Sequence, residues 1–257
     1  MKNQYVGDIG DFGKYGLLKN LCRDLKLGVV WYLTPNDKKK KTDGKFIKYL
    51  NLDSEKYKPG EKERNERRFQ QCDSDLYDKL HKIVDNNKRD VKEIAQREVL
   101  PSDTKYYDSI INRVNRQGWF AETVEAVRNC EIVFLDPDNG FTKTQLTSPK
   151  HVQLDEVKKF FKRGQSLIVY HHLGMHKKGE EQISYWREEI EKTLQGRVDG
   201  KIIILWYHRG TARAYFIIPK TKKHYQRLND AVDRLIRSPW GQGKKPHFTL
   251  LKVSDKG

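Results

Sequence analysis

The sequence is poor in cysteine and in long apolar runs, and each shortage excludes a class of protein. Its three cysteines, Cys22, Cys72 and Cys130, are far apart and form no Cys-x-x-Cys pair. They therefore support neither a disulfide scaffold nor a zinc knuckle. No apolar run is long enough to span a bilayer, and the first residues contain no apolar core of a signal peptide. These shortages predict a cytoplasmic protein without a membrane partner.

Apolar residues are scarce in general. Hydrophobic residues make up 36% of the chain and charged residues 33%. Aromatic residues reach 11%, which is too many for a disordered chain. A chain of 257 residues suits one α/β domain over residues 1–257. The nearly all-polar stretch 51–71 predicts a mobile surface segment, and residues 51–98 are the best candidate for a helical insert.

Positive charge is in excess, with 51 Lys and Arg against 35 Asp and Glu and a formal net charge of +16. Self-repulsion of this excess opposes folding, but the excess attracts polyanions over a long range. The phosphates of DNA or RNA would bind such a chain with release of counterions. The alternative is that the source organism simply makes lysine-rich proteins. The charge favours DNA or RNA as the partner, and nothing in the sequence indicates an oligomeric state.

Apolar runs and helical spacing alternate along most of the chain. Short runs rich in branched and aromatic residues predict strands, whereas apolar residues three or four apart predict helices. This alternation, followed by a hairpin, is typical of a doubly wound, mostly parallel α/β sheet with an antiparallel C-terminal hairpin. Strands are expected at 29–33, 131–135, 166–170, 201–207, 213–219 and 248–251, and helices at 17–25, 76–84, 91–95, 110–114, 119–127, 154–161, 183–194 and 225–235.

The clearest motif is Asp136-Pro137-Asp138-Asn139-Gly140, which directly follows a buried strand. Ligands of doubly wound sheets bind at the carboxyl ends of the strands, so Asp136, Asp138 and Asn139 are candidate catalytic residues. The alternative is an ordinary turn, because Asp, Pro, Asn and Gly are the usual turn residues. The preceding strand and the second acid favour function.

Two histidines, His171 and His172, end the next predicted strand. Neighbouring residues of a strand point to opposite faces, so at most one of them should face the site. That histidine could be a metal ligand, a general base or a stacking platform, although a lone histidine is more often structural. The hairpin segment Trp206–Gly210 could stack on bases, or its aromatics could belong to the core.

The amino-terminal segment Gly7–Lys14 is rich in glycine and precedes the helical pattern that begins at Leu17. As a loop before a helix, it could cradle a phosphate with its backbone amides. It lacks the Gly-Lys-Ser/Thr order of a P-loop and does not follow a strand, so it matches neither nucleotide-binding fingerprint. Asp8 and Asp11 could instead hold a metal, and a purely structural turn remains an alternative.

The order of these motifs resembles the J-type adenine-N6 methyltransferases that modify bacterial 23S ribosomal RNA. Gly7–Lys14 is similar to their amino-terminal Gly-Asn/Asp-x-x-Asp-x-x-Lys segment, and Pro101-Ser102 to their Pro-x-Ser element. Asp136–Asn139 occupies the place of their Asp-Pro-Pro-Tyr motif, and Arg209-Gly210 that of their hairpin turn. The resemblance spans most of the chain as an order of elements, and its motifs are short.

The resemblance implies a Rossmann-like sheet that binds S-adenosylmethionine and methylates a base. It places Gly10, Asp11, Lys14 and Ser102 near the cofactor, and Asp136 at the target amino group. The sequence departs from the family in two places. Thr34-Pro35-Asn36-Asp37 stands where a glycine-rich cofactor loop should follow the first strand, and Asp138-Asn139 replaces Pro-Tyr. The base would then lose its usual stacking partner.

Three functions therefore stay open. The first is a methyltransferase-like enzyme in which His171 or His172 positions the base. The second is a nuclease, with a role in defence against foreign nucleic acid, in which Asp136, Asp138, one histidine and either Asp8 or Asp11 hold Mg²⁺. The third is a non-catalytic module that binds nucleic acid through its basic surface.

Overall fold

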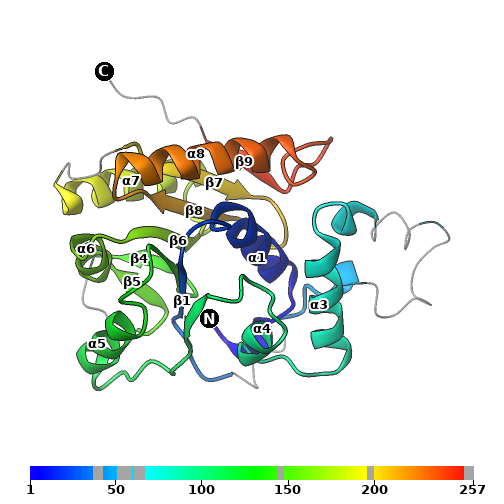
Figure 1. The fold of residues 1–257 in the computed structure, drawn as a ribbon, viewed down its shortest axis with the longest axis horizontal. Helices are drawn as coiled ribbons and strands as arrows, with labels where there is room; N and C mark the ends of the chain where they lie inside the picture. The colour runs from blue at the N-terminus through cyan, green and yellow to red at the C-terminus, as the bar shows by residue number, and fades with distance from the viewer. Residues whose placement is uncertain (37–42, 51–59, 61–66, 144–147, 196–199, 252–257) are drawn as a thin grey trace.

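The computed structural model describes residues 1–36, 43–50, 60, 67–143, 148–195 and 200–251. These residues form a mixed seven-stranded sheet in the order β2-β1-β3-β6-β8-β7-β9 (Figure 1). The strands from β2 to β6 are parallel, whereas β8, β7 and β9 are paired antiparallel. The expected α/β class with antiparallel C-terminal strands is confirmed. The strands are β1 (Leu27–Trp31), β2 (Lys105–Tyr107), β3 (Ile132–Asp136), β6 (Ser166–His172), β7 (Ile203–Tyr207), β8 (Arg213–Ile218) and β9 (Phe248–Leu250).

Helices cover both faces of this sheet, each over its own apolar cluster. The helices α1, α3, α4 and α8 pack on one face, and α5, α6 and α7 on the other. A separate parallel pair, β4 (Gly140–Thr142) with β5 (His151–Gln153), lies beside the second face. The helices are α1 (Ile9–Leu21), α3 (Ser74–Asp85), α4 (Lys92–Gln96), α5 (Arg116–Ala126), α6 (Leu154–Lys162), α7 (Gly179–Leu194) and α8 (Lys222–Arg237), with short 3-10 turns at η1 (Asn3–Tyr5) and η2 (Lys48–Leu50).

The central strands are buried on both faces, which explains their nearly continuous apolar sequences. In β3, Phe134 belongs to the cluster under α1 and α8, whereas Val133 and Leu135 belong to the cluster under α5 and α6. All five residues of β3 are buried, including its last residue, Asp136. This alternation decides which strand-end side chains can reach a common site.

Helix α1 begins earlier than the apolar spacing predicts. Its first residue is Ile9, because the Asp8 side chain accepts hydrogen bonds from the backbone N–H groups of Gly10 and Asp11 and caps the helix. The glycine-rich segment is therefore mostly helix, and the expected loop is wrong. A Cβ atom on Gly10, Gly13 or Gly16 would overlap Arg213, Tyr207 or Trp240, respectively. The spacing of three places these glycines on the packed face of α1.

One further expectation is wrong. Residues 110–114 are not helical, because Ile111 donates its backbone N–H to the Leu33 carbonyl at 2.9 Å and extends the sheet edge. Within the expected insert 51–98, the described part contains α3 and α4, and much of the predicted mobile segment 51–71 lies outside the described residues. No helix in the described part is long and apolar enough to cross a membrane.

Candidate active site

A cavity of about 420 Å³ lies where β3 and β6 end and α1 begins. Parallel strands bring their carboxyl ends to one edge of the sheet, and α1 places its amino-terminal turn against that edge. The cavity therefore combines residues that are far apart in the sequence. Its polar lining includes Asp8, Asp11, Lys14, Asp136, Asp138, Asn139, Lys150, His172 and Arg213.

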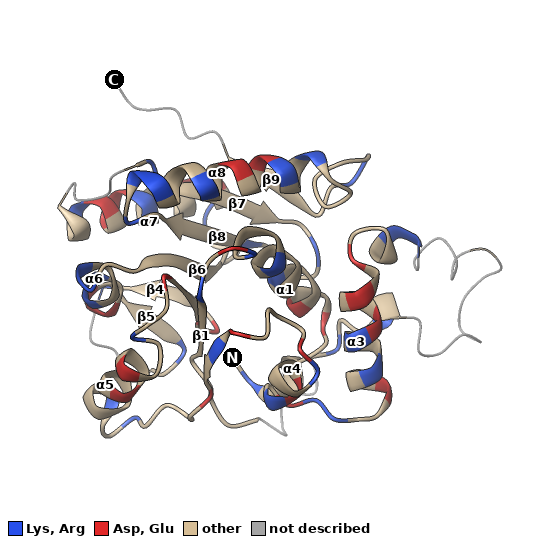
Figure 2. Ribbon diagram, viewed as in Figure 1, with Lys and Arg blue, Asp and Glu red and all other residues tan. Residues whose placement is uncertain are grey.

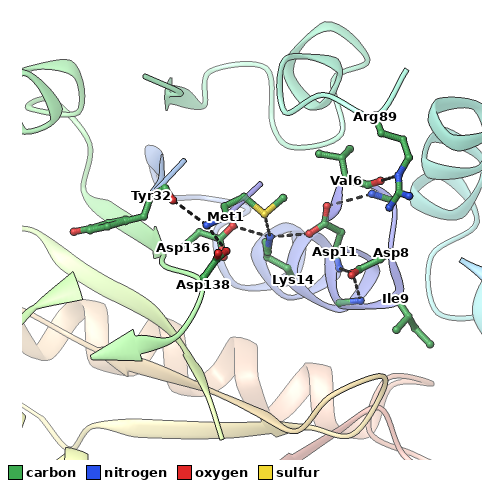
Figure 3. Close-up of polar contacts among 12 residues, drawn as sticks. Met1, Val6, Asp8, Ile9, Asp11, Lys14, Tyr32, Arg89, Asp136 and Asp138 are labelled. Atoms are coloured by element: carbon green, nitrogen blue, oxygen red, sulfur yellow. Dashed lines mark hydrogen bonds and ion pairs between the residues drawn. The ribbon is translucent and has the colours of Figure 1, made fainter. Parts of the chain in front are cut away.

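Lys14 connects the amino-terminal segment to the end of β3. Its Nζ atom lies 2.7 Å from Asp11 Oδ1 and 2.7 Å from Asp136 Oδ2 (Figure 3). All three side chains are buried. Burial acts to lower the pKa of Lys14, but the two carboxylates hold it well above its usual value. The ammonium is thus charged at neutral pH and fixes the orientation of the Asp136 carboxylate.

Asp11 has a second partner besides Lys14. Its Oδ2 atom accepts a hydrogen bond from the Gly7 backbone N–H at 3.2 Å, in addition to the pairing with Lys14. Burial raises the pKa of Asp11 to about 6, against the opposing effect of Lys14. Asp11 therefore belongs to the charged cluster as a partner of Lys14.

Asp138 forms an ion pair with the amino-terminal ammonium of Met1. The Met1 ammonium lies 2.6 Å from Asp138 Oδ1 and donates a hydrogen bond to the Tyr32 carbonyl at 2.9 Å (Figure 3). Met1 is buried, and its sulfur lies 3.7 Å from Lys14 Nζ. No pattern in the sequence marks Met1, because these contacts depend on the folded path of the first residues.

The remaining turn residues hold the backbone in place. Asn139 lines the cavity, and its backbone N–H donates to the Lys150 carbonyl at 2.8 Å. Gly140 has a φ of +100° and packs directly against the His171 ring. A side chain at position 140 would be strained and would overlap that ring. The fold therefore requires glycine at position 140, whether or not the motif binds a ligand.

The two histidines lie on opposite faces of β6, as the strand period predicts. His171 is buried among Phe141, Trp186 and Phe216, and its Nδ1 accepts the Phe141 backbone N–H at 3.2 Å. Burial lowers the pKa of His171 to about 3, so it is neutral and structural.

His172 lines the cavity. Burial lowers the pKa of His172, and the neighbouring Arg213 lowers it further. Of the two histidines, only His172 can therefore contact a ligand in the cavity.

Ser102 does not join the other predicted cofactor residues. It is exposed and lines a different hollow with Lys19, Arg23 and Asp73. Ser102 precedes β2, so it lies near the amino ends of the strands, whereas the cavity lies at their carboxyl ends. Gly10, Asp11 and Lys14, by contrast, come from α1 at the cavity.

The space beside Lys14 is filled by the first residue of the chain. The resemblance places S-adenosylmethionine between the end of β1 and Lys14, but Met1 occupies that space through its contacts with Tyr32 and Lys14. The described residues Thr34–Asn36 after β1 also contain no glycine. The residues present therefore do not fit S-adenosylmethionine at this place.

The carboxylates of the cavity that could bind a metal already have partners. Asp136 and Asp138 each have an ammonium partner, from Lys14 and Met1 respectively, and Asp8 caps α1. Across the described ranges, no group of three or more His, Cys, Asp or Glu could hold a metal ion. The arrangement does not fit Mg²⁺.

A second hollow of about 490 Å³ lies between α5 and α6. Arg116 and Glu156 form an ion pair in its wall at 2.8 Å, and Glu156 also accepts the Tyr32 hydroxyl at 3.1 Å. Lys150 lines the first cavity and Pro149 the second, so the two hollows adjoin. We call this second hollow the basic groove; its cationic side chains are Arg113, Arg116, Lys158, Lys159 and Lys162.

Comparisons with known proteins add no family. A scan against protein-family models found no match, and a search of curated proteins found none either. The fold and the cavity geometry therefore carry the functional argument.

Proposed function

We propose that the protein is an enzyme that acts on nucleic acid and that its catalytic centre is the cavity around Asp136. The observation that carries this proposal is the fixed carboxylate of Asp136. It lies at the carboxyl end of the central strand β3, lines the cavity, and is held by Lys14 at 2.7 Å. A buried carboxylate that is oriented before a ligand arrives is typical of a catalytic site.

Asp136 would act as a hydrogen-bond acceptor for an exocyclic amine of a base. Lys14 binds Oδ2, so Oδ1 is the oxygen that the amine would meet. Bases inside a duplex cannot reach such a pocket, so the target base would be unpaired or turned out of the helix. His172 and Tyr170, which line the same cavity, would contact its ring.

The basic groove supports nucleic acid as the partner. Arg113, Lys158, Lys159 and Lys162 outnumber Asp155 on its surface, while Glu156 is neutralised by Arg116. Figure 2 shows Lys and Arg positions on α6 and along α8, whereas Asp8, Asp11 and Asp136 of the cavity are buried. A backbone bound in the groove would lie next to the opening of the cavity.

The residues of the cavity do not fit S-adenosylmethionine, so methyl transfer, which only the resemblance implies, is tested as an alternative that the geometry opposes. A radiolabelled methyl group from S-adenosylmethionine would be followed into RNA and DNA, with calorimetry of the cofactor alone in parallel. The same nucleic acids would be incubated with Mg²⁺ and with EDTA to detect cleavage. Methylated product supports the enzyme, EDTA-sensitive cleavage supports the nuclease, and binding without either product leaves the non-catalytic module.

The variant D136N tests the catalytic centre itself. Oligonucleotides with one unpaired base would be titrated by fluorescence anisotropy against wild type, D136N and the control D24N, which changes an exposed aspartate. We expect D136N to lose discrimination between amine-bearing and amine-free bases by about tenfold, since one charged hydrogen bond is worth about 1.5–3 kcal/mol. Equal discrimination in all three proteins would contradict the role of Asp136.

A further inference from the structure

Arg213 is a buried cation that forms no ion pair with any carboxylate in the described part of the chain. It is the first residue of β8, is 7% exposed, and lines the cavity. Its guanidinium donates to the Thr211 carbonyl at 3.1 Å through Nε and to Thr211 Oγ1 at 2.8 Å through Nη2. Among the residues that the structure describes, no carboxylate lies within 4.0 Å of it. A buried charge without a counterion is costly unless a ligand supplies one.

The guanidinium is held in position by the residues around it. Its centre lies 5.8 Å from the Tyr170 ring and 5.7 Å from the Tyr207 ring. A Cβ atom on Gly10 would overlap Nη1, so the first turn of α1 leaves room for this group only because position 10 is glycine. Arginine side chains are flexible, so this fixation indicates a site that is formed before the ligand binds.

The surroundings of Arg213 also suit an anion. His172 lies directly opposite on the neighbouring strand and lines the same cavity, as does Lys150. Against the effect of burial, the charge of Asp8 raises the pKa of Arg213, but Asp8 forms no ion pair with it, and its Oδ1 accepts hydrogen bonds from the N–H groups of Gly10 and Asp11. The other carboxylates of the cavity have their own cations: Lys14 pairs with Asp11 and Asp136, Met1 with Asp138, and Lys2 with Asp43.

We propose that Arg213 is the centre of an oxyanion-binding site in this cavity and that its ligand is a phosphate group. A planar guanidinium presents parallel N–H donors that match two oxygens of a phosphate. The source of the phosphate rests on the proposed function: in a nucleic-acid enzyme it is a phosphodiester beside the target base. Free phosphate shares the chemistry, and the experiment below separates the two sources.

The test uses inorganic phosphate and three variants of the full chain. Thermal unfolding would be measured with phosphate and with chloride at matched ionic strength, for wild type, R213M, R213K and the control R128M. Arg128 is an exposed arginine just after the end of α5 that is paired with Glu125. We expect phosphate to raise the Tm of wild type and R128M by several degrees, of R213K less, and of R213M not at all.

Stability without phosphate separates ligand binding from a structural role. If Arg213 serves a ligand, R213M relieves an unpaired charge, so its Tm in chloride equals or exceeds that of wild type. If Arg213 only supports the two tyrosines, R213M lowers the Tm and phosphate stabilises every variant equally. That second pattern would overturn the proposal.

Oligonucleotide binding distinguishes the two sources of phosphate. For a phosphodiester ligand, R213M weakens oligonucleotide binding at least tenfold, and inorganic phosphate competes with the oligonucleotide in wild type. Phosphate stabilisation without oligonucleotide binding keeps the anion site and contradicts the proposed function. Oligonucleotide binding that is unaffected by R213M keeps the function and contradicts a phosphodiester at Arg213.

Discussion

The ammonium of Lys14 is shared by two buried carboxylates, and the three charges stabilise one another only as a set. Each charge alone would be expensive to remove from water, and the two contacts of 2.7 Å offset that cost. Lys14 therefore fixes the orientation of the Asp136 carboxylate, and it also occupies the Oδ2 atom that could otherwise bind a metal. The site residues are therefore tied to the stability of the fold.

Replacing Lys14 by methionine should destabilise the protein by about 3 kcal/mol at pH 8, because Asp11 and Asp136 lose their cation. Burial already raises the pKa of Asp11. A carboxyl with a raised folded pKa destabilises the fold as pH rises, so the deficit should shrink at pH 5. Urea unfolding at pH 8 and pH 5 measures this loss of unfolding free energy relative to wild type. K19M removes a half-exposed lysine of the same helix and should cost less than about 1 kcal/mol.

The change G140A tests the structural part of the turn motif. Position 140 combines a φ of +100° with direct contact to His171, so we expect a loss of about 2–4 kcal/mol. The matched control is G164A, because Gly164 has a φ of +95° and no neighbour within 4 Å of a Cβ atom. Equal losses of unfolding free energy in the two variants would show that the His171 contact contributes nothing.

At the scale of elements, α1 illustrates how packing overrides local preference. Alanine stabilises an exposed helix by about 1 kcal/mol relative to glycine. In G16A the new Cβ would overlap the Trp240 ring, so we expect a net loss of about 1–3 kcal/mol by urea unfolding. G16A should cost less in a W240L background than in wild type, and an equal cost in the two backgrounds would contradict the close approach.

The strands and most helices could be predicted because their apolar residues follow the period of the element. Strand β3 and helix α6 lie where their patterns place them. Helix α1 begins earlier than predicted because its glycines indicate a loop by composition, whereas their spacing of three also fits one face of a helix. The short strands β2, β4 and β5 have three residues each, which is too few for a periodic signal.

The candidate site was predictable only where its residues end a strand or begin a helix. The motif at Asp136, the residue Lys14 and one of the two histidines meet at the cavity. Arg213 and Met1 could not be found in this way, because their partners are distant in the sequence and no local pattern marks them. The neutralised carboxylates likewise became visible only with the ion pairs.

At the scale of the whole molecule, two buried histidines predict sensitivity to acid. Burial lowers the pKa of His171 and of His247 to about 3. The unfolded chain binds these protons near pH 6.5, so stability falls as pH drops from 6.5 toward 3, by up to about 5 kcal/mol for each histidine.

The variant H171N checks this pH dependence, because its amide oxygen can still accept the Phe141 N–H. We expect the fall in unfolding free energy between pH 7 and pH 4.5 to be smaller than in wild type. The control H176N removes an exposed histidine and should keep the wild-type slope. A slope unchanged by H171N would show that His171 does not contribute.

The basic groove predicts how nucleic-acid binding depends on salt. Removing two of its cations in K159Q/K162Q should reduce the slope of log K against log[salt] by about 1–2, through the loss of two phosphate contacts. The control R234Q/R237Q makes the same charge change on exposed residues of α8, over the opposite face of the sheet. A larger effect of the α8 pair, measured by anisotropy at several salt concentrations, would move the binding surface there.

The direction of β8 has a consequence for how this cavity could be adapted. Parallel strands contribute their last residues to the carboxyl edge of a sheet, but β8 runs the other way and contributes its first residue, Arg213, beside His172. The position of that guanidinium therefore depends on the turn between β7 and β8. No parallel strand of the sheet is attached to this turn. Lengthening or shortening this turn would retune which ligand the pocket accepts while the framework of the sheet stays unchanged.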